Sequence, residues 1–267
     1  MLATILIIIV LLVTWLVINI QYSILLPSPK GLRILMYHSV SLNTSDGITV
    51  TTEQLQSHFD YLKKRKYNVI SFQDLFHYID TKTTIPKRSI VLTFDDGYQN
   101  NCDLLFPLLA KYNFKATIFL PIKFLGRTNE WDNGKDKLMN EHTIQNTEGK
   151  LISYGLHSYS HKNYRHLSIA EVEEDVKLCV QGAIDKKIPY VNVFAYAYGG
   201  LPKDELAKEA LANIFKQHSI RLALRIGNKV NSMPFKNPFE LKRIDIKGTD
   251  TFFEFKTKVK KGRVKMF

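Results

Sequence analysis

The sequence has 267 residues, of which 45% are hydrophobic and 23% are charged, and its formal net charge is +12. With this share of hydrophobic residues the chain can bury a substantial core, which excludes a chain too polar to fold. The roughly 240 residues beyond the first thirty are enough for one α/β barrel or one large α/β domain. The two cysteines, Cys102 and Cys179, form no recognisable metal-binding or redox pattern.

The first residues differ in character from the rest of the chain. Residues 1–29 contain no charged side chain, and residues 2–26 form one apolar segment. A helix needs ~20 mainly apolar residues to cross a membrane. We therefore expect residues 1–26 to form one transmembrane helix that anchors the chain, with a linker at 27–31. A cleaved signal peptide is the alternative, but its usual basic start and small-residue cleavage site are missing.

Beyond residue 31, strand and helix patterns alternate. Capping residues Thr51, Ser71 and Ser168 each predict the start of a helix. The alternation predicts parallel βα units, whose strand ends meet on one face, where active sites are built. The expected elements, in chain order, are strand 32–37, helix 51–65, a strand near 69, a helix from 71, strand 89–94, a helix through 109, strand 115–120, an irregular loop 126–150, strand 151–156, a helix from 168, strand 191–196, helix 202–218 and strands 221–225 and 241–246.

The end of the chain is strongly basic. We expect a barrel domain at residues 32–257 and a basic tail at 258–267. This tail could bind an anionic membrane surface or serve only to aid solubility; we expect no nucleic-acid partner. Six basic residues lie among the last twelve: Lys256, Lys258, Lys260, Lys261, Arg263 and Lys265.

Two adjacent carboxylates, Asp95 and Asp96, follow the strand 89–94. Where a strand gives way to a turn, consecutive side chains point in different directions, so one carboxylate can bind a metal while the other faces a water molecule. Asp-Asp-Gly is also an ordinary turn sequence.

Two histidines, His157 and His161, follow another strand in the sequence H-S-Y-S-H. One helical turn would place both imidazoles on the same side, as a shared metal requires. With one of the aspartates they make a 2-His-1-carboxylate triad, which suits zinc, cobalt, nickel, manganese or iron. His38 closes the first strand, and if the strand ends meet it lies near this metal, free to protonate a leaving amine.

With these motifs, T-F-D-D-G-Y at 93–98, H-S-Y-S-H at 157–161 and F-A-Y-A-Y-G at 194–199, the chain resembles the polysaccharide deacetylases of carbohydrate esterase family 4. The resemblance covers residues 32–257 and implies an irregular (β/α)7 barrel. The family's late L-x-x-H motif matches only residues 35–38, near the start. The chain therefore looks like the circularly permuted branch, similar to the poly-N-acetylglucosamine deacetylases of biofilm formation.

The resemblance also implies roles for the site residues. Asp95 would be the general base, while Asp96, His157 and His161 would hold a divalent metal, with zinc favoured. His38 would be the acid, and the backbone N–H of Tyr198 would contact the oxyanion.

The third motif departs from the family pattern, since alanines at 195 and 197 replace the usual arginine and proline. Arg243 could substitute for that arginine and orient Asp95, and Asp245 could pair with His38. The simpler alternative is that Arg243 and Asp245, two residues apart on the expected strand 241–246, serve only in an ordinary structural ion pair. Trp131 and Tyr159 could stack on sugar rings or simply pack in the domain.

The implied activity is the metal-dependent removal of N-acetyl groups from an acetamido sugar in a polysaccharide or oligosaccharide. A lipid-linked acetamido sugar at the membrane is an alternative substrate, and a carbohydrate-binding pseudoenzyme is an alternative function. We expect a single-pass protein of the cell membrane. Lys30 and Arg33 would place the domain in the cytoplasm by the positive-inside rule, whereas the resemblance suggests an extracytoplasmic domain.

Overall fold

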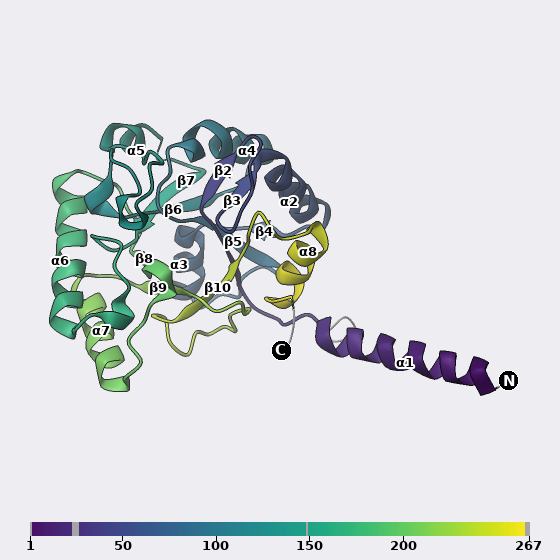
Figure 1. Ribbon diagram of the computed structural model, residues 1–267. Coiled ribbons are helices and arrows are strands. Elements are labelled where there is room, and N and C mark those ends of the chain that lie inside the picture. Colours follow the sequence, from purple (N-terminus) through teal and green to yellow (C-terminus); the bar gives the residue numbers. More distant parts are fainter. Residues whose placement is uncertain (1, 23–26, 148, 265–267) are drawn as a thin grey trace.

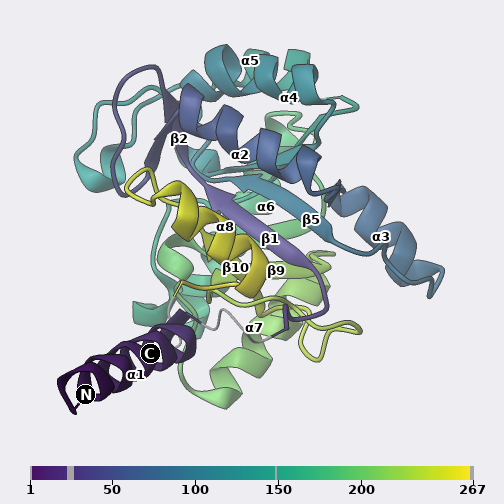
Figure 2. The same ribbon diagram turned by 90° about the vertical axis from the view of Figure 1, so that its right-hand side faces the viewer.

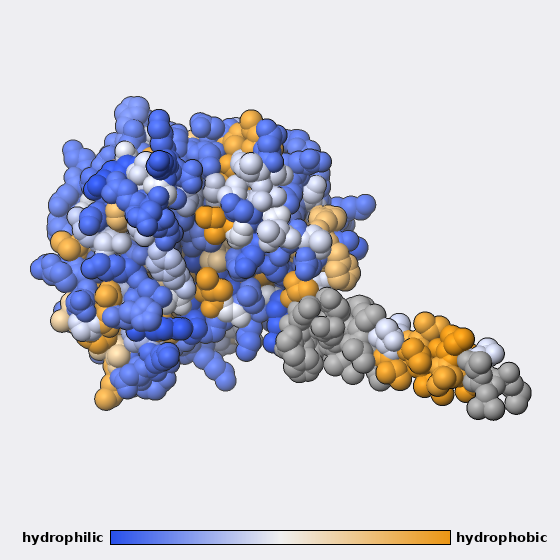
Figure 3. Space-filling view, viewed as in Figure 1, coloured by the Kyte–Doolittle hydropathy of each residue, from blue (hydrophilic) through white to orange (hydrophobic). Residues whose placement is uncertain are grey.

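The computed structural model describes residues 2–22, 27–147 and 149–264, and in the first of these ranges it describes the side chains of residues 4–15. Helix α1 (Leu2–Tyr22) leads away from the barrel (Figure 1), and its side chains from Ile5 to Val13 are exposed. On the face drawn in Figure 3 the hydrophobic colouring is densest on this helix.

Within the described residues, no helix is both long and apolar enough to cross a membrane. The prediction of a membrane anchor at residues 1–26 therefore finds no support in that part of the chain. Residues 1 and 23–26 of the predicted anchor lie outside the described residues.

Seven parallel strands form a closed barrel. Strand β1 closes the ring, because it pairs with β10 on one side, Leu35 opposite Ile244, and with β5 on the other, Ile34 opposite Val91. The predicted (β/α)7 barrel is confirmed. Around the ring the strands are β1 (Arg33–Tyr37), β10 (Leu241–Asp245), β9 (Leu222–Ile226), β8 (Val193–Ala195), β7 (Ile152–Leu156), β6 (Ala116–Leu120) and β5 (Ser89–Phe94).

Helices cover the outside of this barrel (Figures 1 and 2). Strand β4 (Asn68–Val69) pairs with β5, and β2 (Ser39–Ser41) pairs with β3 (Thr49–Thr51) in a separate two-stranded sheet. The α-helices of the domain are α2 (Thr52–Lys64), α3 (Phe72–Asp80), α4 (Phe106–Tyr112), α5 (Glu141–Thr147), α6 (Ile169–Asp185), α7 (Glu205–Gln217) and α8 (Phe252–Lys261).

The helix starts follow from local hydrogen bonding. Thr51, Ser71 and Ser168 each accept a hydrogen bond from the backbone of the third residue of their helix, whose own side chain accepts one in return from the capping residue's N–H. Each reciprocal pair satisfies two backbone donors that the first turn leaves free. The three helix starts predicted from the sequence are thereby confirmed.

The core has two parts because strand side chains alternate in direction. Leu35 and Leu92 belong to a large cluster that includes the buried faces of the helices. Ile34, Val91 and Phe119, on the opposite faces of the strands, belong to a second cluster. Arg243, Asp95 and His38 lie at alternate positions that continue this second set along β10, β5 and β1, so the inward face becomes polar towards the carboxyl ends of these strands.

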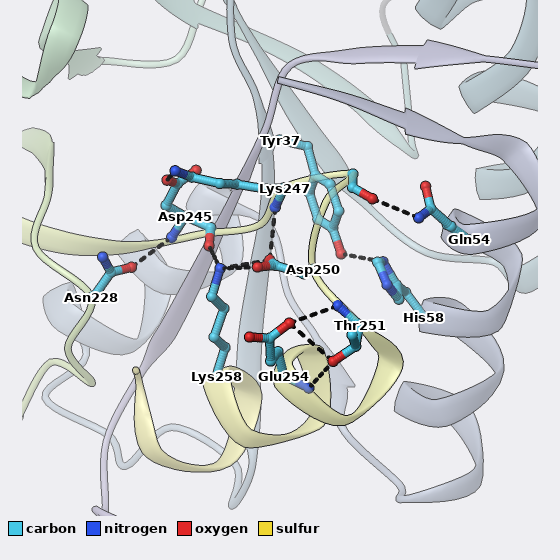
Figure 4. A network of polar contacts seen from close by, with 11 residues as sticks. Tyr37, Gln54, His58, Asn228, Asp245, Lys247, Asp250, Thr251, Glu254 and Lys258 are labelled. Atoms are coloured by element: carbon cyan, nitrogen blue, oxygen red, sulfur yellow. Dashed lines mark hydrogen bonds and ion pairs between the residues drawn. The ribbon is translucent and has the colours of Figure 1, made fainter. Parts of the chain in front are cut away.

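Three features differ from the expectations. Residues 126–150 contain helix α5 and a 3-10 turn at Glu130–Asp132, so this segment is not a wholly irregular loop. The small sheet of β2 and β3 was not foreseen. Helix α8 crosses the expected boundary between barrel and basic tail: Val259 is fully buried, and the Lys258 ammonium donates to the Asp250 carboxylate and to the Asp245 carbonyl (Figure 4).

Candidate metal and acid-base site

Strand β5 ends in a tight turn that carries both candidate carboxylates. The N–H of Asp95 donates to the carbonyl of Tyr37 at 2.9 Å, which continues the pairing with β1. Asp96 and Gly97 then adopt left-handed backbone angles, with φ of 71° and 67°. A Cβ on Gly97 would lie 2.7 Å from the Leu120 side chain, so glycine suits this position on both counts. The turn sends the two carboxylates to different partners.

The carboxylate of Asp95 is held by Arg243 from strand β10. Both guanidinium nitrogens donate to it, Nη1 to Oδ1 at 2.5 Å and Nη2 to Oδ2 at 2.7 Å, and both residues are buried. The Arg243 guanidinium also lies 5.6 Å from the centre of the Phe119 ring. Burial, the largest influence, would raise the pKa of Asp95, but the charge and hydrogen bonds of Arg243, together with the nearby His157 and His38, outweigh it and lower that pKa. Arg243 thus occupies the position proposed for it from the sequence.

Asp96, His157 and His161 converge on one point. One possible ligand atom from each lies within 4.8 Å of the others, and all three residues are buried. The Oδ1 atom of Asp96 is 3.4 Å from Nε2 of His157 and 3.1 Å from Nε2 of His161. The structure therefore brings together the three ligands predicted from two separate motifs.

The donor set fits a divalent cation. Nδ1 of His157 lies 2.8 Å from the carbonyl of Ala195, so this nitrogen carries the proton and Nε2 presents a lone pair to the carboxylate. Oδ1 of Asp96 is buried and lacks a hydrogen-bond partner among the described residues. Lone pairs that face one another in a buried site call for a proton or a metal ion between them, and two imidazoles with one carboxylate suit zinc or a related transition metal.

Electrostatics in the cluster favour negative carboxylates. Burial opposes ionisation of Asp96, yet the adjacent imidazoles of His157 and His161 hold its pKa well below the usual range. Burial lowers the pKa of His157, but the nearby charges of Asp95 and Asp96 outweigh it and raise that pKa. In the absence of a cation a proton takes its place, so metal binding and protonation compete here.

The H-S-Y-S-H segment is not the helical turn that was expected. Ser158 and His161 have left-handed φ angles of 65° and 54°, and no helix spans residues 157–163. The carboxylate of Asp175, from α6, shapes the loop instead. It accepts hydrogen bonds from the backbone N–H groups of Tyr159 and Ser160, and also from the hydroxyls of Ser160 and Tyr164.

Asp175 was missed in the sequence, although a signal was present. It lies on the apolar stripe of α6 beside Val172, Val176 and Cys179, and all four are buried. A carboxylate on a buried stripe needs several hydrogen-bond donors to compensate for lost hydration.

His38 lies at the same strand-end face as the other candidates. Its Nε2 is 3.9 Å from Oδ2 of Asp95, and its carbonyl accepts a hydrogen bond from Asn101, the first residue of the π-helical segment Asn101–Leu105. The suggested pairing of His38 with Asp245 is not seen: no ion pair joins them among the described residues, and the Asp245 carboxylate lies 3.7 Å from Nζ of Lys247 instead.

Aromatic side chains form one wall of the site. The Trp131 ring stacks on the His161 imidazole, with centroids 4.3 Å apart, and the Tyr198 ring meets the same imidazole edge-on at 4.8 Å. The hydroxyl of Tyr198 donates to Asp132 at 2.9 Å. The role suggested for the Tyr198 backbone N–H stays a prediction. Tyr159 packs near Gly182 of α6.

These residues surround a cavity of about 360 Å³ at the carboxyl ends of the strands. His38, Asp95, Asp96 and both histidine ligands line it, together with Tyr198. It can hold one group the size of a monosaccharide beside two carboxylates and three histidines.

Comparison with known proteins agrees with this geometry. The family described as polysaccharide deacetylase matches residues 82–219. Over 116 residues the chain is 31% identical to the Bacillus subtilis protein YxkH, which carries the same family name; this is 43% of the chain and 41% of that protein. The chain therefore spans less than half of that relative.

Two further matches cover more of the chain. A poly-beta-1,6-N-acetyl-D-glucosamine N-deacetylase of Staphylococcus aureus is 24% identical over 212 residues, 77% of this chain and 70% of that protein. The structure of IcaB from Ammonifex degensii superimposes with a TM-score of 0.72 at 18% identity and covers 87% of this chain and 97% of that one. At this identity the likeness shows the fold.

Proposed function

The chain belongs to the polysaccharide deacetylase family, and we propose that it removes N-acetyl groups from a polymer of β-1,6-linked N-acetylglucosamine by metal-assisted hydrolysis. One observation carries the proposal: a buried Asp-His-His cluster lies next to a second carboxylate and a histidine in one cavity. The name of the Staphylococcus aureus relative supports the choice of polymer.

The residues divide the chemistry between them. Asp96, His157 and His161 would hold a divalent metal, which when bound polarises the acetamido carbonyl and acidifies a water molecule. Asp95, kept ionised by Arg243, accepts the proton of the attacking water. His38, whose Nε2 lies 3.9 Å from Asp95, donates a proton to the departing amine. Acetate and a free amino group are the products.

A carbohydrate-binding pseudoenzyme is disfavoured by the same site. Such a protein commonly lacks a ligand or a base, whereas both the ligand set and the base candidate are present and meet in one cavity.

Two variants test the proposal. His161→Ala removes one ligand and should abolish both stoichiometric metal binding and deacetylation, measured by elemental analysis and by acetate release from defined β-1,6-N-acetylglucosamine oligomers. Asp95→Asn should keep the metal and lower the rate by at least ~10²-fold, the scale for loss of a general base. Unchanged acetate release by Asp95→Asn would contradict the assignment of the base.

The acid is tested separately. His38→Ala should retain the metal, because His38 is outside the ligand cluster, and should lose ~10²-fold or more in rate. A metal-free His38→Ala protein would mean that His38 supports the ligands and is not the acid.

We further propose an extracytoplasmic site of action at the cell membrane, where such polymers lie. The uncharged sequence of residues 1–29 and the exposed aliphatic side chains of α1 support it. Fractionation followed by protease treatment of intact cells tests it: a domain that stays protected until cells are lysed would contradict this location.

A further inference from the structure

A second polar site lies at the opposite end of the strands that carry the catalytic candidates. Arg33 begins β1 and Arg88 immediately precedes β5, whereas His38 and Asp95 follow these same strands. We call this site the basal pocket; it has a volume of about 180 Å³. Its lining includes Arg33, Tyr61, Arg65, Tyr67, Arg88 and Lys260.

The basal pocket is rich in positive charge without a matching carboxylate. Three guanidinium groups and one ammonium line it, and none of them forms an ion pair with an acidic side chain among the described residues. Burial and the nearby charge of Arg88 lower the pKa of Arg33, although Tyr67 acts in the opposite sense. Uncompensated like charges repel one another, so an anion would stabilise their arrangement.

Arg33 forms the rigid base of this pocket. Its side chain is 5% exposed and donates four hydrogen bonds to backbone carbonyls, those of Pro29, Gly31, Val259 and Lys260. These bonds fix the guanidinium but do not neutralise it, and they leave one of its five N–H donors unused. Arg65 and Arg88, by contrast, are exposed: Nη1 of Arg88 donates to the Arg65 carbonyl at 2.6 Å, and the Arg65 guanidinium lies 5.9 Å from the centre of the Tyr61 ring.

Tyr61 supplies an independent indication of a ligand. Only 7% of this residue is exposed, and its hydroxyl is buried without a hydrogen-bond partner among the described residues. A buried hydroxyl without a partner is costly, so native structures usually satisfy it with a bound group. Tyr61 lines the same pocket as the three arginines.

We propose that the basal pocket binds one phosphate group. The lining side chains present donors almost exclusively, and arginine forks match the oxygens of phosphate. A phosphate carries more negative charge and more acceptor oxygens than a carboxylate, which suits a pocket with four cations. Ser28, from the segment that links α1 to the barrel, also lines the pocket. The phosphate comes from the headgroup of an anionic phospholipid or from inorganic phosphate.

Calorimetric titration of the full chain with inorganic phosphate tests the pocket. The wild type should bind one phosphate per chain. Arg65→Gln with Arg88→Gln should weaken binding by about tenfold or more, because two charge-assisted hydrogen-bond donors are lost. Lys64→Gln with Lys87→Gln is the matched control: it removes the same charge from the two neighbouring exposed residues outside the pocket, and affinity should stay within about twofold.

Tyr61→Phe separates ligand binding from folding. Because the hydroxyl has no partner in the described structure, the variant should keep or raise the melting temperature, yet weaken phosphate binding by about tenfold. Absence of phosphate binding by the wild type, or equal weakening in the lysine control, would overturn the proposal.

Vesicles distinguish the two sources of phosphate. Binding to phosphatidylcholine vesicles with and without phosphatidylglycerol is compared for the wild type, the arginine variant and the lysine variant. Loss confined to the arginine variant on phosphatidylglycerol identifies a lipid headgroup. If the wild type and both variants bind these vesicles equally, while the arginine variant has lost the binding of inorganic phosphate seen by calorimetry, the ligand is inorganic phosphate.

Discussion

At the scale of single residues, Arg243 decides the state of the candidate base. It is fully buried, and its charge is matched by one carboxylate, that of Asp95, through two hydrogen bonds. This geometry lets a buried aspartate stay ionised and points its free lone pairs to the cavity.

We expect Arg243→Lys to keep the positive charge but lose the bidentate hydrogen bonding to Asp95, and Arg243→Met to lose both the charge and the hydrogen bonds. The pKa of Asp95, lowered by Arg243, should then rise. A base with a raised pKa is protonated at higher pH, so the acid limb of the pH–rate profile should move upward, more in the methionine variant. Arg225→Met, on the neighbouring strand and 3.4 Å from Glu240, is the control. An unmoved acid limb would mean that Asp95 is not the base.

Breaking this pair also affects stability. Removal of one partner of a buried ion pair leaves the other charge uncompensated, at a cost of ~3–5 kcal/mol. The pH–rate profiles should therefore be compared in variants shown to be folded by circular dichroism.

At the scale of elements, helix α6 positions the loop that carries both histidines. Asp175 is the contact: its carboxylate accepts four hydrogen bonds from residues between 159 and 164. Since Ser158 and His161 have left-handed backbone angles, the loop depends on such external support.

Asp175→Asn should lower metal affinity by about 10–100-fold, the scale for loss of a group that supports metal ligands. The new amide N–H₂ would face N–H and O–H donors, so part of the bonding is lost. Affinity is measured by competition with a chelator. Glu174→Gln removes a neighbouring charge on the same helix and should leave affinity unchanged. Equal affinity for Asp175→Asn and wild type would show that the loop holds its shape without α6.

The elements that sequence patterns predicted well are those whose signal is local. Residues 89–94, with the apolar residues Ile90 to Leu92 and Phe94, form β5 with the expected bounds, and Ser168 caps α6. The meeting of Asp96 with His157 was also predicted, because parallel strand ends share a face. The features that the patterns do not predict depend on distant contacts: the basic tail is expected from residue 258, but helix α8 continues to Lys261, Val259 is buried and Lys258 donates to Asp250.

At the scale of the whole molecule, the order of strands in the ring differs from their order along the chain. Strand β1 lies between β5 and β10, so the first strand is held by one of the last and by the strand that carries Asp95. This arrangement brings His38 within 3.9 Å of Asp95, as the permuted motif order predicted. It also makes the two ends of the domain depend on each other.

His58 joins these two ends. It lies on α2, and its Nδ1 is 3.2 Å from the hydroxyl of Tyr37 on β1 (Figure 4). Its ring stacks on Phe255 of α8, with ring centroids 3.7 Å apart. Burial, followed by the charge of Lys258, lowers the pKa of His58 from 6.5 to about 3. The folded state therefore holds this imidazole neutral where the unfolded chain would protonate it.

The pH dependence of unfolding follows from that difference. Between pH 6.5 and about 3 the unfolded chain binds the extra proton, so the stability due to His58 is complete above pH 6.5 and is lost as the pH falls, by at most about 1.4 kcal/mol per pH unit. His58→Phe should flatten the fall in the free energy of unfolding between pH 6.5 and 4.5 by about 2 kcal/mol, measured with denaturant at each pH. Tyr37→Phe, which removes the hydrogen bond but keeps the buried imidazole, should retain the wild-type slope. Identical slopes in wild type and His58→Phe would show that His58 is protonated in the folded barrel and that another group causes its loss of stability in acid.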